Sequence, residues 1–282
     1  MNDLVLLSLI IFIFIRVIGL GISIDFLNGT KAEKFKFLAL GWFFWMLGVV
    51  TPILSNLVEN IFLKEILLVL NAFLAALGTI FVLWGFFKYF MTVSFKKMVI
   101  LIFIFFISTV LLFLITDYVV TIAFCALFMN LLFFSTFVIP PIKKKSFKKF
   151  MGRSIIWYYA SLLTLSIFFP ISIIIALQGY RYGLYNADDP VLITFNYLPI
   201  MITSILFIIL LVHLEDTTSS RQQLELKDNY SHDLGNILQV ISSAFELIEM
   251  KGRSESETSE LGELLKDKLN EAAKQIRDIR EL

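Results

Sequence analysis

Charged residues are scarce in this chain of 282 residues: they make up 17% of it, against about 25% in an ordinary soluble domain. Cysteine occurs once, at Cys125, so disulfide bonds within the chain play no part, and a small buried apolar side chain is the simplest interpretation of that residue. The 13 glycines are scattered and form no Gly-rich phosphate-binding loop. His213, Glu215 and Asp216 cluster without a convincing metal-ligand spacing. The sequence therefore carries no signature of a disulfide scaffold, a metal site or a bound cofactor.

Apolar residues, by contrast, make up 58% of the chain and include 30 phenylalanines. They gather into seven runs, each about as long as the roughly 20 residues that a helix needs to cross the hydrocarbon core of a membrane. A backbone in lipid must satisfy its own hydrogen bonds, and a helix does so within one segment. The sequence predicts an all-α protein with a bundle of seven transmembrane helices in the lipid bilayer. The runs are Leu4–Ile24, Phe37–Ser55, Ile66–Phe87, Met98–Ile115, Val119–Ile139, Ser154–Leu177 and Val191–Val212.

Basic residues are unevenly distributed among the short loops between these runs. The first, third and fifth loops together carry twelve Lys and Arg residues, whereas the loops on the other side carry only Lys64 and Arg181. Positively charged loops stay on the cytoplasmic side of a membrane. We therefore predict a multi-pass protein of the cell membrane, with its N-terminus outside and its C-terminus in the cytoplasm.

The composition changes at His213. From this residue onward the chain carries nine basic and fifteen acidic residues, whereas the preceding part is basic overall. No Gly-rich or Ser-rich linker separates the two parts, so the last span is expected to continue as a helix into the cytoplasm. We predict three regions: a transmembrane domain at 1–212, a helical linker at 213–229 and a helical hairpin at 230–282.

Both predicted helices of the hairpin are amphipathic, because apolar residues recur along each at a spacing of three and four. Two helices alone cannot bury two such stripes. Pairing two hairpins into a four-helix bundle would bury them, so a homodimer is expected. The apolar positions are Leu234, Ile237, Leu238, Ile241, Ala244, Phe245 and Ile248 in the first helix and Leu261, Leu265, Leu269, Ala272, Ile276 and Ile279 in the second.

The polar side of the first hairpin helix presents His232, Asn236, Gln239 and Ser243 on one face. A neutral imidazole nitrogen is a good nucleophile, and a neighbouring carboxylate such as Asp233 can hold the other ring N–H and stabilise positive charge as a bond forms. An amide at Asn236 can position a water or a phosphoryl oxygen. The alternative is an exposed histidine beside an ordinary helix aspartate.

The segment from Tyr230 to Leu247 resembles the phosphoacceptor box of sensor histidine kinases, in which His is followed by an acid and, three residues later, by Asn or Thr. The longer run HDxxNxLQ is similar to the boxes of sporulation phosphotransferases and of peptide-pheromone receptor kinases. The resemblance covers 224–282 and implies that His232 is the phosphoacceptor. It further implies an acid-base and orienting role for Asp233, a phosphatase or positioning role for Asn236, and a phosphotransfer surface that includes Gln239 and Ser243.

This resemblance implies a two-component phosphorelay, in which the chain is part of a protein-histidine kinase and passes phosphate to a response-regulator receiver domain. The ATP-binding domain of that family, with its Asn box and Gly-rich boxes, is not found in these 282 residues. We therefore expect ATP and Mg²⁺ to be bound by a kinase domain in cis, in a longer chain, or by a partner in trans. A nucleic-acid partner is not expected.

Arg16 lies near the middle of the first apolar run. Placing a cation at this depth of a membrane costs free energy, so such a residue is a candidate functional residue. Its candidate partners are Asn71, Asn130 and Asn196, backbone carbonyls or an anionic ligand, so Arg16, Asn71 and Asn130 are the candidate sensor residues. Snorkelling or a structural hydrogen bond is the alternative interpretation of Arg16.

A second class of function is also compatible with the sequence. The seven spans can form a receptor or a transporter whose cytoplasmic helices only dimerise. Against transport, no pair of Gly/Pro-broken helices recurs in corresponding halves. Replacement of His232 separates the two classes, because a dimerising tail would tolerate it and a phosphorelay would not.

Overall fold

The computed structural model describes residues 3–92, 94–145, 147–177, 190–249, 266–268, 270–272 and 274. Every regular element within these ranges is a helix, so the predicted all-α class is confirmed for the described part of the chain. Residues 178–189, between the predicted sixth and seventh spans, lie outside it. The elements are α1 (Asp3–Thr30), α2 (Glu33–Ser55), α3 (Ile61–Phe87), α4 (Phe95–Ile115), α5 (Tyr118–Lys143), α6 (Phe147–Met151), the 3₁₀ turn η1 (Gly152–Ser154), α7 (Ile155–Leu177) and α8 (Pro190–Glu249).

Six helices among the described residues are long and apolar enough to cross a membrane, and they mark the chain as a membrane protein. These helices are α1 to α5 and the segment Tyr197–Ile241 of α8. α7 occupies the predicted sixth span, but its side chains are described only as far as residue 167, and it is not among the six. The count of seven spans stays a prediction.

The chain divides into two compact units, Met1–His213 and Leu214–Leu282. The boundary coincides with the change in composition at His213. α8 contributes to both units, and the predicted linker at 213–229 is helical throughout.

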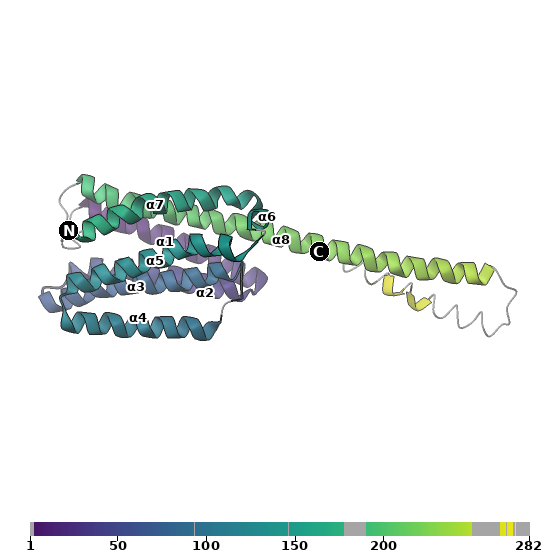
Figure 1. Ribbon diagram of the computed structural model, residues 1–282, viewed down its shortest axis with the longest axis horizontal. Helices are drawn as coiled ribbons and strands as arrows, with labels where there is room; N and C mark the ends of the chain where they lie inside the picture. Colours follow the sequence, from purple (N-terminus) through teal and green to yellow (C-terminus); the bar gives the residue numbers. More distant parts are fainter. Residues whose placement is uncertain are drawn as a thin grey trace. The chain divides into compact units, whose positions relative to one another are not determined.

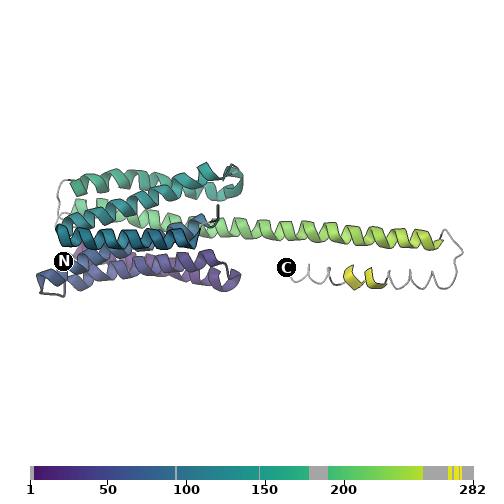
Figure 2. The same cartoon turned by 60° about the horizontal axis from the view of Figure 1, so that its bottom comes forward.

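Within the first unit, the helices run roughly side by side (Figures 1 and 2). α2 and α3 approach each other closely through glycines. A Cβ atom built on Gly41 would lie 2.5 Å from Val82 Cγ2 and 2.9 Å from the Gly78 carbonyl oxygen, and one built on Gly78 would lie 2.8 Å from the Gly41 carbonyl oxygen. Small residues at a contact allow two transmembrane backbones to pack closely in the absence of a hydrophobic driving force.

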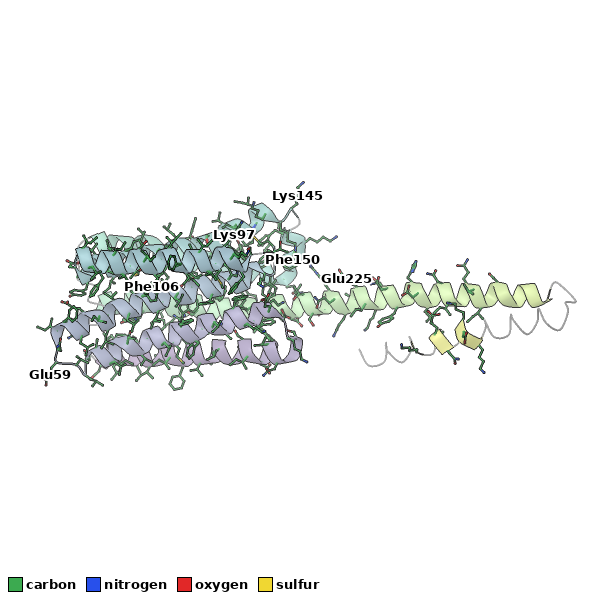
Figure 3. The ribbon with its side chains drawn as sticks, turned by 90° about the horizontal axis from the view of Figure 1, so that it is seen from below. Glu59, Lys97, Phe106, Lys145, Phe150 and Glu225 are labelled. Atoms are coloured by element: carbon green, nitrogen blue, oxygen red, sulfur yellow. The ribbon has the colours of Figure 1, made fainter. Side chains whose placement is uncertain are left out.

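Charged side chains collect at the two ends of this unit. Figure 3 shows Lys97 and Lys145 at one end and Glu59 at the other. At the basic end, Lys88 pairs with Glu33, and the Lys34 ammonium lies 3.8 Å from the centre of the Tyr89 ring. This separation of charge agrees with the distribution of basic loops in the sequence, while the orientation in a membrane stays a prediction.

Apart from Lys96 and Lys97 in its first turn, the exposed side chains of α4 are apolar. This helix buries only Met98, Phe105 and Thr109 among its side chains. Phe103 and Phe106 are 62% and 50% exposed. Such a surface is unfavourable in water and is suited to contact with lipid.

The second unit holds the predicted hairpin. Ile237 and Ile241 of α8 are buried in a cluster with Ala272, and Leu234 packs against this cluster. Residues 266–268, 270–272 and 274 are helical, and Ala272 packs on the apolar stripe of the first predicted helix. The side chains of Leu238, Ala244, Phe245 and Ile248 lie outside the described residues, and the homodimeric four-helix bundle stays a prediction.

Candidate functional site

His232 lies on the solvent-exposed side of α8. Its side chain is 75% exposed, whereas Ile237 and Ile241 are 5% and 8% exposed. Because successive helix residues are separated by about 100°, His232 faces nearly opposite to Ile241. Packing of the apolar stripe against Ala272 therefore fixes the rotation of the helix and directs His232 to solvent.

Two polar groups contact the same nitrogen of the His232 ring. The Asn236 Nδ2 atom lies 3.3 Å from His232 Nδ1, and the Asp233 Oδ1 atom lies 3.6 Å from it. When Nδ1 carries no proton, the Asn236 amide donates to it; when Nδ1 is protonated, the Asp233 carboxylate is the nearby acceptor, just beyond hydrogen-bond distance. Both contacts leave Nε2 unused.

This arrangement allows nucleophilic chemistry at Nε2. A proton held at Nδ1 leaves the lone pair on Nε2, and the Asp233 carboxylate can stabilise the positive charge that the ring gains when Nε2 forms a bond. Asp233 is 59% exposed, so this stabilisation is screened by water and is modest.

Gln239 and Ser243 extend the polar strip by two further turns, and both are exposed. With His232 and Asn236 they form one accessible face of α8, as their spacing predicts. A partner protein that docks on this strip would reach His232 without disturbing the apolar cluster on the other side.

Gly235 is a residue of this region that the sequence interpretation missed. It is exposed, and a Cβ atom built on it would have no neighbour within 4 Å. The helix therefore has an open space without a side chain directly beside the polar strip. The sequence did contain a signal for this residue, namely a single glycine within a regular helical pattern. Glycine lowers the stability of a helix, so its presence there indicates a packing or functional reason.

Arg16 occupies a different environment, inside the first unit. Its side chain is 7% exposed, and its Nε and Nη1 atoms have no hydrogen-bond acceptor among the described residues. Aromatic rings surround the guanidinium: the Cζ atom lies 4.4 Å from the centre of the Trp45 ring, 5.5 Å from that of Phe12 and 5.8 Å from that of Trp42. Arg16 is thus held inside the bundle.

Trp45 is fixed for this contact by α3. Its Nε1 atom donates to the Ala75 carbonyl oxygen at 2.8 Å and to the Thr79 hydroxyl at 3.1 Å. A desolvated cation–π contact is worth about 2 kcal/mol. Burial of an ion costs several kcal/mol even after relaxation. The rings therefore offset only part of the cost of burying Arg16.

Asn71 and Asn130, two of the asparagines expected to pair with Arg16, are described in α3 and α5. The Asn71 amide donates to the Gly48 carbonyl oxygen at 2.5 Å, and this bond ties α3 to α2. Asn130 is buried in α5. Neither of them accepts from Arg16 Nε or Nη1, and the Asn196 side chain lies outside the described residues. The pairing of Arg16 with Asn71 or Asn130 stays a prediction, and the contacts that the structure gives to the guanidinium are with the rings of Phe12, Trp42 and Trp45.

No family model, curated protein or solved structure matches the chain. Functional inference therefore depends on the residues and their geometry.

Proposed function

We propose that this chain is the membrane-bound sensor of a two-component phosphorelay. A seven-span bundle, with its N-terminus outside the cell, receives the stimulus, and the cytoplasmic hairpin carries the phosphoacceptor His232. A kinase domain in cis or in trans supplies the phosphoryl group from Mg²⁺-bound ATP, and an aspartate of a response-regulator receiver domain takes it.

The observation that supports this proposal best is the geometry around His232. One ring nitrogen lies against a carboxylate and an amide, and the other is unused on a side chain that is 75% exposed. A structural histidine buried in a helix bundle would have neither the exposure nor the free nitrogen. The run HDLGN, from His232 to Asn236, thus has a spatial arrangement that suits phosphoryl transfer.

In the proposed reaction, the Nε2 lone pair of His232 attacks the γ-phosphorus of ATP. The bond between this phosphorus and the bridging oxygen breaks, and ADP leaves with the bond's electron pair. The proton on Nδ1 stays in place, so the phosphorylated ring is cationic and Asp233 lies beside the charge. A receiver carboxylate then attacks the same phosphorus, and the departing imidazole returns to its neutral form.

Dimerisation belongs to the same proposal. Ile237, Ile241 and Ala272 form a buried cluster within one hairpin. Two helices alone cannot bury two full apolar stripes, and pairing with a second hairpin would bury them in a four-helix bundle. In such a dimer the kinase domain is held close to the phosphoacceptor, which raises the effective concentration of the phosphoacceptor at the kinase domain.

The test uses phosphotransfer to the full chain in nanodiscs from an ATP-loaded histidine-kinase domain. The chain has two histidines, so His213→Gln is a matched control for His232→Gln. We expect acid-labile, base-stable labelling of the parent chain and of His213→Gln, and none of His232→Gln. Equal labelling of His232→Gln would overturn the proposal and leave the hairpin as a dimerising tail.

A further inference from the structure

Exposed cations are concentrated in residues 143–153, which connect α5 to α7 through α6 and η1 at one end of the first unit (Figure 1). We call this stretch the basic segment. The chain has no Asp or Glu between Asp117 and Asp188, so neither the basic segment nor the helices on either side of it supply a neutralising charge. The exposed cations are Lys143, Lys145, Lys148, Lys149 and Arg153.

Apolar residues of α6 hold the basic segment against the bundle. Phe147 and Met151 are 5% and 0% exposed, and the centre of the Phe147 ring lies 5.0 Å from that of Tyr158 in α7. Residues four positions apart share one face of a helix, so this pair defines the inner face of α6. Lys148 lies off that face and is exposed. Packing of the aromatic and apolar side chains therefore fixes which side chains of α6 reach the surface.

The ends of the basic segment add further cations to the same surface. Gly152 turns the chain from α6 into α7 with a φ angle of 54°, a conformation that residues with a side chain rarely adopt, and the exposed Arg153 follows directly. Before α6, the Lys144 ammonium lies 3.5 Å from the centre of the Phe150 ring. Figure 3 shows Lys145 pointing away from the bundle. Within the described ranges, neither Lys145 nor Arg153 forms an ion pair.

Exposed apolar side chains border the basic segment on both sides and indicate its depth in a membrane. Ile142 directly precedes it and is 73% exposed, and Ile156 follows Arg153 by three residues and is 67% exposed. Such side chains on a transmembrane bundle are suited to contact with hydrocarbon. One turn of a helix spans about 5.4 Å, and the headgroup region on each side of a bilayer is about 5 to 8 Å thick. The cations therefore lie at the level of the lipid headgroups.

We propose that the basic segment selectively binds the headgroups of anionic phospholipids. The phosphodiester of such a lipid carries a negative charge and accepts charge-assisted hydrogen bonds from ammonium and guanidinium groups. Clusters of Lys and Arg directly beside a transmembrane helix attract anionic lipids in this way. A soluble acidic protein would have to enter the headgroup layer to reach the same side chains, so their depth favours a lipid. The proposal does not depend on the chemistry of His232.

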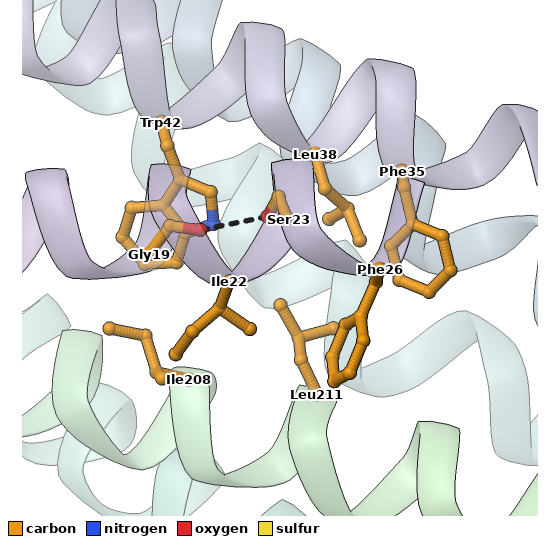
Figure 4. Close-up of a pocket in the computed structure, with 9 residues that line it drawn as sticks. All are labelled: Gly19, Ile22, Ser23, Phe26, Phe35, Leu38, Trp42, Ile208 and Leu211. Carbon is orange, nitrogen blue, oxygen red and sulfur yellow. Dashed lines mark hydrogen bonds between the residues drawn. The ribbon is translucent and has the colours of Figure 1, made fainter. Parts of the chain in front are cut away.

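The interior of the same unit has a hollow between α1, α2 and α8, and Gly19 and Trp42 form part of its wall (Figure 4). Its volume is about 10 Å³, which is the space of one water molecule. A phosphodiester headgroup does not fit into it. This hollow is therefore not an alternative site for the proposed lipid.

The experiment measures lipid selectivity by electron paramagnetic resonance. The full chain is reconstituted in phosphatidylcholine bilayers that contain a trace of spin-labelled phosphatidylglycerol or of spin-labelled phosphatidylcholine. The fraction of each lipid that the protein immobilises gives its relative association constant. We expect a preference of about threefold for phosphatidylglycerol at low salt, and we expect 1 M NaCl to abolish most of it, because salt screens exposed charges.

The decisive variant combines Lys145→Gln, Lys148→Gln and Arg153→Gln. All three side chains are exposed, so the fold should persist, and circular dichroism checks this. We expect the preference for phosphatidylglycerol to fall to less than half of the parent value. The charge-preserving combination of Lys145→Arg, Lys148→Arg and Arg153→Lys should retain it.

A matched control removes three exposed cations from the other basic loops, through Lys31→Gln, Lys36→Gln and Lys96→Gln. It lowers the net charge by the same amount and should retain most of the preference. An equal loss in both glutamine variants would overturn the proposal, since net charge alone would then attract the lipid. Equal immobilisation of both lipids by the parent chain would also overturn it. Binding of polyglutamate to the parent chain in phosphatidylcholine nanodiscs, without any lipid preference, would assign the surface to an acidic protein instead.

Discussion

The two polar sites of this chain differ mainly in their surroundings. Arg16 is 7% exposed and is surrounded by aromatic rings, whereas His232 is 75% exposed and has a carboxylate and an amide within 4 Å. A buried cation without an anion raises the free energy of the fold until an anion reaches it, so it is suited to recognising a ligand. An imidazole in water is displayed at little cost and stays accessible to a large partner, so it is suited to transfer between proteins.

The largest expected effect of a single substitution is at the apolar side of the hairpin. Ile241→Asp places a carboxylate beside Ile237 and Ala272 with no partner, and we expect the hairpin to lose about 3 kcal/mol or more of unfolding free energy. Hydrogen exchange of the amides from 234 to 241 in the full chain measures this loss. Val240→Asp, at a side chain that is 42% exposed, is the control. Equal protection in both variants would show that the cluster does not hold the hairpin together.

A smaller loss is expected where α2 and α3 meet. Gly41→Ala brings a methyl group within 2.9 Å of α3 backbone atoms, so the helices must separate, at a cost of about 1 to 3 kcal/mol. Reversible unfolding in mixed detergent measures the loss. At Gly21 an added Cβ atom meets nothing within 4 Å, and Gly21→Ala should therefore not destabilise the bundle. If both variants unfold alike, close packing of these backbones does not contribute to stability.

Asp233→Asn tests the charge beside the phosphoacceptor. Loss of the carboxylate removes the stabilisation of the cationic ring, and an exposed ion pair worth about 1 kcal/mol corresponds to roughly fivefold slower phosphotransfer. Rapid-quench kinetics with a kinase domain in trans measures the rate, and Asp228→Asn, at an exposed acid of α8 one turn before His232, is the control. An unchanged rate would show that the Asp233 carboxylate does not contribute to phosphotransfer and is an ordinary residue of the helix surface.

The smallest effect is expected at Gly235, and its sign is positive. Alanine has a higher helix propensity than glycine, and no atom lies within 4 Å of the added methyl group. Gly235→Ala should therefore stabilise the hairpin by up to about 1 kcal/mol, measured by thermal unfolding. A loss of stability would show instead that a second chain covers this side of α8 in the dimer.

Helical periodicity is sufficient to predict the surroundings of His232. The polar strip and the apolar stripe lie on one helix. The spacing along that helix therefore already places each residue on the exposed or the buried face, as it does for His232, Asn236, Ile237 and Ile241. The boundaries of the first span were less predictable: the apolar run ends at Ile24, but α1 continues to Thr30. Hydropathy marks the apolar part of a helix, and the helix itself continues as far as its backbone hydrogen bonds do.

The surroundings of Arg16 could not be predicted in the same way. They depend on how α1 and α2 are rotated against each other, which brings Trp42 and Trp45 to the guanidinium and ties Asn71 to Gly48. The low amphipathicity of such apolar helices removes the periodic signal that orients a soluble helix. The spacing of Gly41 and Gly48 was the one available sign of a close contact along α2.

The position of the phosphate on the His232 ring is the most direct measurement. Nδ1 lies against Asp233 and Asn236, so we predict that phosphoryl transfer to the full chain labels Nε2. NMR spectroscopy of ¹⁵N-histidine-labelled protein distinguishes the two nitrogens by their coupling to phosphorus, and the two histidines are separated by comparison with His213→Gln. Phosphate on His232 Nε2 is the predicted result. Phosphate on Nδ1, on His213 or on no histidine would contradict the role assigned to this site.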